Sequence, residues 1–120
     1  MLPRPRRVNR PDDFRRVLRR GRKSGRRLLV VHAIATTAPD ADATVLVASR
    51  AGLVVGRAVG NAVVRHRVSR QLRALLRDRL DGLPAGTDLV VRAQPPAAGS
   101  TSVELGSDLD AALTRLGLRG

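Results

Sequence analysis

The sequence predicts a small α+β domain in which helices pack on a single β-sheet. Three observations predict this class. The chain has 120 residues, a length typical of one domain, and 42% of them are hydrophobic, which is enough for one modest core. Segments with apolar residues at helical spacing alternate with short β-branched apolar runs, and turn residues separate them. We expect one two-layer sandwich spanning 1–120, with residues 1–9 as a basic arm and 117–120 as a frayed tail.

The first element is a short helix at roughly 11–20. Pro11 suits a first helical turn, and the carboxylates of Asp12 and Asp13 suit the positive end of the helix dipole. Gly21 suits the residue after the last turn. An apolar stripe at i, i+3 and i+4 is formed by Phe14, Val17 and Leu18.

The next elements are strands. A β-branched apolar run at 28–36 has the length of one strand, and a loop at 38–42 follows it. A second strand is predicted at 43–49. The sequence leaves open whether Ala51 and Gly52 make a tight turn before a third strand at 53–55, or whether 43–57 is one long strand with a bulge at Gly52.

A second helix carries the clearest pattern of the chain. Asn61 is a good N-cap, and the helix continues to Leu80 before Gly82 and Pro84 end it. Its apolar face is formed by Val64, Val68, Leu72, Leu75 and Leu76. At about 100° per residue, the opposite face collects His66, Arg67, Arg70, Arg73 and Arg77. Arg65 projects near the apolar edge instead.

The remaining elements are a buried strand at 87–93, a loop at 95–100 and an amphipathic helix at roughly 103–116. The apolar face of this last helix is formed by Leu105, Leu109, Leu113 and Leu116. The residues therefore predict the order α-β-β(-β)-α-β-α.

The charge is concentrated in two blocks. Residues 1–27 hold eleven arginines and Lys23 against two aspartates, a net of +10, and residues 50–79 hold eight arginines against Asp78, a net of +7. The remaining residues are acidic, with a net of −4, and the whole chain carries +13. Two blocks of this density, one of them on a patterned helix, indicate a nucleic-acid partner.

Composition excludes several kinds of site. Without cysteine there is no disulfide, thiol chemistry or cysteine-based zinc site, and two histidines cannot form a three-histidine centre. The chain has no phosphate-cradling glycine loop and no nucleophile elbow, and its basic blocks lack the clustered carboxylates of a two-metal nuclease. No apolar run approaches a membrane span, and no secretory signal is present. We expect a soluble cytoplasmic protein with no catalytic side chain, no metal ligands and no membrane partner.

Residues 60–73 read GNAVVRHRVSRQLR. This stretch resembles the signature of the bacterial ribonuclease P protein subunit, G-[NK]-A-V-x-R-N-R-[VI]-K-R-x-[LI]-R, known as the RNR motif. The segments at 7–21, 28–32 and 88–91 match the flanks of the family in order, so the resemblance covers roughly 7–116.

The sequence departs from this family at several positions. His66 replaces the asparagine of the motif, Ser69 replaces a lysine, and Gly56 replaces a serine. Leu18 and His32 stand where the family has aromatic residues, so Phe14 is the only aromatic ring of the chain. Whether these departures reduce activity stays open.

The resemblance implies an αβββαβα fold and a protein that pairs with a catalytic RNA. The complex would remove the 5′ leader of precursor tRNA by hydrolysing one phosphodiester, with the chemistry supplied by the RNA and by Mg²⁺ bound mainly to that RNA. The residues implied for binding the RNA subunit are Arg65, His66, Arg67, Arg70, Arg73 and Arg77. A cleft between the first helix and the sheet would hold the single-stranded leader through Phe14, Leu18, His32 and Arg57. Further basic contacts are expected from Arg7, Arg15 and Arg20.

Three other interpretations remain. The chain could be a non-catalytic RNA- or ribosome-binding protein, which would not favour precursor over mature tRNA. It could be a DNA-associated regulator, but the segment before the second helix reads as strand and loop and not as the partner of a helix-turn-helix motif, so we expect no DNA partner. It could also be a degenerate paralogue. Because aromatic rings are so few, we expect weaker base stacking and a larger electrostatic share in leader binding than is typical of the family.

Overall fold

The computed structural model describes residues 7–8, 10–35 and 49–119. The elements in chain order are α1 (Pro11–Arg20), β1 (Arg22–Gly25), β2 (Leu29–Ala35), β3 (Arg50–Val54), α2 (Ala62–Arg79), the 3-10 turn η2 (Leu80–Gly82), β4 (Thr87–Ala93), the 3-10 turn η3 (Pro95–Gly99) and α3 (Ser102–Arg115). This is the αβββαβα order, and the α+β class is confirmed. The strand predicted at 43–49 lies almost entirely outside the described residues.

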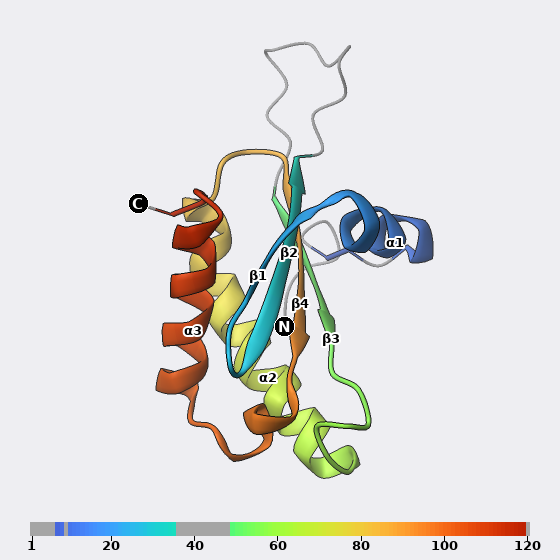
Figure 1. Cartoon of the computed structure of the whole chain (residues 1–120), viewed down its shortest axis with the longest axis vertical. Helices are drawn as coiled ribbons and strands as arrows, with labels where there is room; N and C mark the ends of the chain where they lie inside the picture. Colours follow the sequence, from blue (N-terminus) through green and yellow to red (C-terminus); the bar gives the residue numbers. More distant parts are fainter. Residues whose placement is uncertain (1–6, 9, 36–48, 120) are drawn as a thin grey trace.

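The sheet has the strand order β1-β2-β4-β3. β1 pairs with β2 and β2 with β4 in antiparallel fashion, whereas β3 and β4 are parallel. Parallel neighbours need a crossover connection, and α2 supplies it. As a result, α2 begins beyond the carboxyl end of β3 and returns the chain to the start of β4 (Figure 1).

The helices lie on both faces of the sheet (Figure 1). α2 and α3 cover one face, where they bury a large core with the side chains that alternate along β2 and β4, such as Leu29, Val31, Leu89 and Val91. α1 lies over part of the other face, where Val17 packs with Val90 in a smaller cluster. The predicted two-layer packing therefore describes the sheet with α2 and α3, and α1 adds a partial third layer. Because both faces are covered, β2 and β4 are buried along most of their length.

Strand β1 is not predicted by its own sequence. Its four residues read RKSG, and only Ser24 is buried. The strand forms because β2 offers an unpaired edge: Lys23 lies opposite His32, and the turn closes with the Arg26 N–H donating to the Leu29 carbonyl at 2.8 Å. The partner strand, and not local propensity, determines this element.

The interpretation of Ala51 and Gly52 as a tight turn is wrong. Both residues lie inside β3 and pair with Leu89 and Val90 of β4. A Cβ atom at Gly52 would lie 2.6 Å from the ring of Phe14, so glycine allows α1 to approach the sheet closely.

Both ends of the described chain are tied down. In the segment expected to be an irregular arm, Arg7 forms a parallel bridge with Ala51, and the buried Val8 donates its N–H to the Ala51 carbonyl at 3.0 Å. In the tail expected to fray, the Leu118 N–H donates to the Leu113 carbonyl at 2.9 Å. Arg119 forms an ion pair with Asp110 at 2.9 Å.

Candidate nucleic-acid interface

The solvent-facing side of α2 is strongly basic. The Asn61 side chain caps the helix by accepting the Val64 N–H at 3.0 Å, as predicted, and no acidic residue lies in the first turn. Val68, Leu72 and Leu76 are fully buried against the sheet, which orients the opposite side toward solvent. The residues on that side are His66, Arg70 and Arg77, which are exposed, and Arg73, which is half-buried. We refer to these four residues as the α2 basic face.

Two arginines of the motif do not belong to this face. Arg67 was predicted to share it, but it is half-buried and donates a hydrogen bond from Nη2 to the Ala98 carbonyl, so it ties α2 to η3. Arg65 is half-buried near the apolar side, as its spacing predicted, and its Nε has no hydrogen-bond partner among the described residues. Two residues at about 100° each place Arg65 and Arg67 on nearly opposite sides of the helix, so they can serve separate contacts.

Another arginine of α2 is structural. Arg79 donates from Nε to Asp110 Oδ1 at 2.6 Å and from Nη2 to Oδ2 at 3.1 Å, a bidentate pair that joins α2 to α3. This hydrogen bonding raises the pKa of Arg79 and lowers the pKa of Asp110. Part of the +7 block is therefore neutralised inside the fold.

A second group of predicted residues gathers on the α1 side of the sheet. Phe14 and Leu18 of α1 pack on the cluster of Val17 and Val90. His32 of β2 lies directly opposite Val90, so the register places it on the same face. The structure thus brings Phe14, Leu18 and His32 to one side of the sheet.

Arg57 is not brought to this group. It lies exposed in the turn after β3, near the start of α2. Two cations that the sequence did not single out lie closer, since Lys23 pairs with His32 across β1 and β2, and Arg92 neighbours it on β4. The sequence signal for Arg92 was that it is the single cation within the strand predicted at 87–93, and the structure shows it as the one exposed residue of β4.

His32 is a buried and uncharged member of this group. Burial lowers the pKa of its imidazole, and the charges of Arg92 and Lys23 lower it further. Since the ordinary pKa is about 6.5, the ring is neutral at pH 7. Both ring nitrogens are buried without a hydrogen-bond partner among the described residues. The positive charge on this side of the sheet therefore comes from Lys23 and Arg92, and not from His32.

A buried ionic network holds α1 on the sheet, and the sequence analysis did not foresee it. Asp88 of β4 is fully buried and accepts from Arg50 Nε at 3.0 Å and Arg50 Nη2 at 2.6 Å. Arg16 of α1 donates to the same carboxylate at 3.1 Å, and Asp13 lies 3.6 Å from Arg50. Hydrogen bonding to Asp88 raises the pKa of Arg50. These four residues, the Asp88 network, connect α1, β3 and β4.

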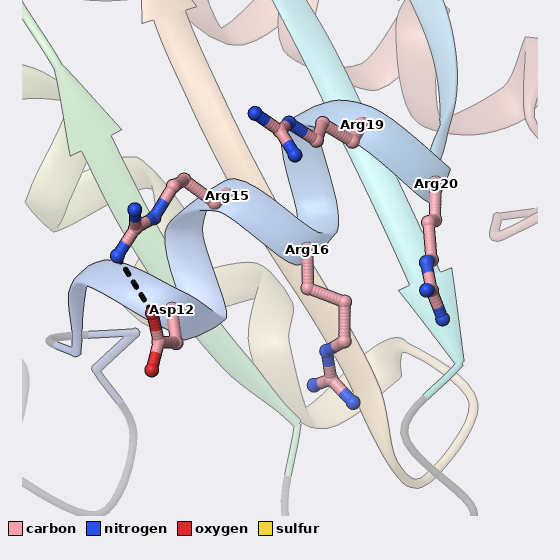
Figure 2. A pocket seen from close by; sticks show the side chains of 5 residues that line it. All are labelled: Asp12, Arg15, Arg16, Arg19 and Arg20. Carbon is pink, nitrogen blue, oxygen red and sulfur yellow. Dashed lines mark hydrogen bonds and ion pairs between the residues drawn. The ribbon is translucent and has the colours of Figure 1, made fainter.

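The remaining predicted contacts lie at the edge of the sheet and on α1. Arg7 lies beside β3, at its bridge with Ala51. Arg15 and Arg20 lie with Arg16, Arg19 and Asp12 around a hollow of about 400 Å³ on the side of α1 that faces away from the sheet (Figure 2).

Comparisons with known proteins identify the family. Residues 2–117 match the family model described as Ribonuclease P. The chain belongs to the ribonuclease P protein family. Two relatives, each named "Ribonuclease P protein component", come from Rhodococcus opacus and Streptomyces avermitilis. The first is 51% identical over 98% of this chain and 94% of that protein, and the second is 50% identical over 97% and 95%.

Solved ribonuclease P proteins share the fold. The protein from Staphylococcus aureus superposes with a TM-score of 0.79 at 23% identity, covering 96% of this chain and 98% of that one. The protein from Thermotoga maritima gives a TM-score of 0.69 at 22% identity, covering 86% and 90%.

The described part of this ribonuclease P family member contains no group of three or more His, Cys, Asp or Glu side chains placed to hold a metal ion. Three of its buried or half-buried carboxylates are engaged in hydrogen bonds. Asp88 and Asp110 accept from arginines, and Asp108 accepts the Leu28 N–H at 3.0 Å. In the same described residues, no helix is both long and apolar enough to cross a membrane.

Proposed function

We propose that this chain binds the catalytic RNA of ribonuclease P and the 5′ leader of precursor tRNA, and so assists Mg²⁺-dependent removal of the leader. The observation that carries the proposal is the separation of two different surfaces by one sheet. The α2 basic face offers a row of basic residues with no acidic residue in the first turn of the helix. The opposite side of the sheet offers the aromatic ring of Phe14 and, on the same face, the cations Lys23 and Arg92.

The α2 basic face suits the RNA subunit. Arg70, Arg73 and Arg77 span about 10 Å along the helix, which is enough to meet two or three successive phosphates. Guanidinium groups bind phosphate oxygens in bidentate fashion. Neutralising phosphates where two RNA molecules crowd together lowers the Mg²⁺ concentration that folding and binding require. Arg65 and His66 would extend this contact at the start of the helix.

The α1 side of the sheet suits a single strand. Phe14 can stack on one base, an interaction worth about 1–3 kcal/mol. Lys23 and Arg92 attract the backbone, and the buried, neutral His32 lies beneath the strand and adds no charge. Leu18 supplies apolar contact without the ring that relatives have there. Arg57 would meet the strand near the start of α2.

The chemistry is assigned to the RNA. The carboxylates of the described chain that would have to bind Mg²⁺ are held by arginines and backbone amides, so the residues present do not fit a protein-bound ion. Mg²⁺ bound mainly by the RNA subunit would activate the attacking water there. The role of the protein is then to bind and position two RNA molecules, in the cytoplasm where tRNA precursors are processed.

One reconstitution tests this function. The purified chain is mixed with its cognate RNA subunit and a precursor tRNA at low Mg²⁺, and release of the 5′ leader is measured. The expected result is faster cleavage than by the RNA alone, together with tighter binding of precursor than of mature tRNA. Cleavage no faster than by the RNA alone would overturn the proposal. Equal affinity for precursor and mature tRNA would indicate a general RNA-binding protein instead.

A further inference from the structure

The side of α1 that faces away from the sheet carries a concentration of positive charge that the proposed function does not yet use. Arg15 and Arg19 lie one turn apart on this side, and Arg16 and Arg20 lie one turn apart beside them, around the hollow of about 400 Å³ (Figure 2). Among the described residues, Asp12 is the one acidic residue that lines it. We call these four arginines the outer face of α1.

The charges of the outer face are available to a ligand. Arg15 pairs with Asp12 at 2.6 Å, but both side chains are exposed, so the pair is weak and a phosphate can displace it. Arg19 and Arg20 are exposed and have no ion pair within the described residues. Arg16 donates to the buried Asp88 from one side, so its guanidinium is already held in place at the edge of the hollow.

Helix stability does not explain this arrangement. Like charges at i and i+4 destabilise a helix, and α1 contains two such arginine pairs. The helix dipole favours cations in the last turn, which accounts for Arg19 and Arg20 only. Arg16 is accounted for by its bond to Asp88. Arg15 lies in the middle of the helix, where the dipole offers no benefit, and its partner Asp12 is exposed, so its position points to a polyanionic ligand.

The position of α1 indicates which polyanion reaches it. The Asp88 network holds α1 across one end of the sheet, over the row Ile34–Asp88–Arg50. The opposite end of the same face, with Arg92 and Val54, leads to the turn before α2. Figure 1 shows α1 running across the strands at the end away from the start of α2.

A leader on this face therefore has a defined direction. The RNA subunit, which carries out the cleavage, binds at α2, so the end of the leader nearest the scissile bond lies at the α2 end. The strand then runs along the sheet past Arg92 to Phe14 and Leu18, where α1 blocks its path. To continue, its backbone has to pass over α1, and the arginines it meets there are Arg15 and Arg19.

We propose that the outer face of α1 binds the phosphodiester backbone of the distal leader, upstream of the nucleotides held against Phe14. This inference rests on the proposed function and extends it, because it assigns a second leader subsite. Bases are not read there: the outer face offers guanidinium groups and no aromatic ring, so binding is independent of sequence and sensitive to salt.

The test compares two precursor tRNAs. One has a leader just long enough to show the full effect of Phe14→Ala, and the other has a leader extended by several nucleotides. In the wild-type holoenzyme the extension should strengthen binding by about threefold to tenfold, as expected for two exposed ionic contacts. The variant Arg15→Gln with Arg19→Gln should lose this gain and bind both precursors alike. For the extended precursor, the slope of log affinity against log salt concentration should also become less steep by about 1.4.

A charge-matched control is Arg27→Gln with Arg115→Gln, since both residues are exposed and Arg115 lies on α3, on the far face of the sheet. This control should keep the gain from the extension. If the Arg15 and Arg19 variant keeps the gain, the proposal is overturned. It is also overturned if the variant weakens assembly with the RNA subunit equally for both precursors, because the surface then belongs to that RNA.

The two proposed leader subsites can be refuted separately. Both subsites are supported if the Arg15 and Arg19 variant loses the tighter binding of the extended precursor and Phe14→Ala weakens binding of the short precursor. If Phe14→Ala binds the short precursor as well as wild type does while the extension still depends on Arg15 and Arg19, the subsite at Phe14 is refuted and the outer face of α1 stands.

Discussion

Replacing Asp88 by asparagine should weaken the attachment of α1 to the sheet without changing the shape of the side chain. The carboxylate is fully buried and accepts three hydrogen bonds, two from Arg50 and one from Arg16. Asparagine keeps one acceptor oxygen but has no charge, so both guanidinium groups lose their counter-ion. Asp13, 3.6 Å from Arg50, compensates only in part.

The size of the effect follows from burial. Removing one partner of a buried ion pair costs about 3–5 kcal/mol. The Arg16 and Arg50 side chains are 37% and 26% exposed, so water solvates part of the released charge. We therefore expect a loss of about 2–4 kcal/mol in the free energy of unfolding. At roughly 4 °C per kcal/mol for a chain of this length, Tm should fall by about 8–16 °C.

Urea and thermal unfolding followed by far-ultraviolet circular dichroism measure this change, because the chain has no Trp or Tyr for fluorescence. Asp12→Asn is the matched control: the same substitution, made on α1 at a carboxylate that is 92% exposed. It should cost at most about 1 kcal/mol. If Asp88→Asn costs no more than Asp12→Asn, the buried network does not hold α1. In the holoenzyme, Asp88→Asn should weaken leader binding more than assembly with the RNA subunit, since α2 packs on the other face.

Three further predictions concern the binding surfaces. Phe14→Ala should weaken binding of precursor tRNA by about 1–3 kcal/mol and leave mature tRNA unaffected, as measured by equilibrium titration of the holoenzyme. Equal losses for both tRNAs would argue against a leader contact. Arg70→Gln with Arg73→Gln should weaken assembly with the RNA subunit. It should also reduce the slope of log affinity against log salt concentration by about 1.4–1.8, whereas Arg115→Gln should leave the affinity and the slope unchanged. Because the pKa of His32 is lowered in the folded state, the unfolded chain binds more protons just below pH 6.5, so stability should fall as pH decreases through that range. His32→Phe should remove this contribution, and a wild-type-like loss of stability in that variant between pH 7 and pH 5 would show that another group is responsible.

The distribution of charge is less uniform than the net value of +13 indicates. Arg50, Arg16 and Arg79 are ion-paired with buried or half-buried aspartates, and Arg67 is bound to a backbone carbonyl. These arginines stabilise the fold. The cations left for RNA include Arg65, Arg70, Arg73 and Arg77 of α2, Arg57 in the turn before it, Arg15, Arg19 and Arg20 of α1, and the pair formed by Lys23 and Arg92.

Several elements were predictable because their signals are local. The bounds of α1 and β4 match the predicted ranges 11–20 and 87–93, since proline, early acids and a continuous apolar run are read within a few residues. The start of α2 follows from the Asn61 cap. The helix α3 begins at Ser102, one residue before the predicted range, because Thr101 and Glu104 form a capping box.

The sequence by itself determined the α+β class, the amphipathic helices and the family, because periodicity, capping and a contiguous motif depend on neighbouring residues. Only the tertiary structure decided that RKSG is a strand, that Gly52 makes room for Phe14, and that Asp88 joins α1 to the sheet. It also decided which arginines remain available for RNA. Each of these depends on a partner distant in the chain: Asp88 lies 72 residues from Arg16 and 38 from Arg50, and no local pattern encodes a contact across that separation.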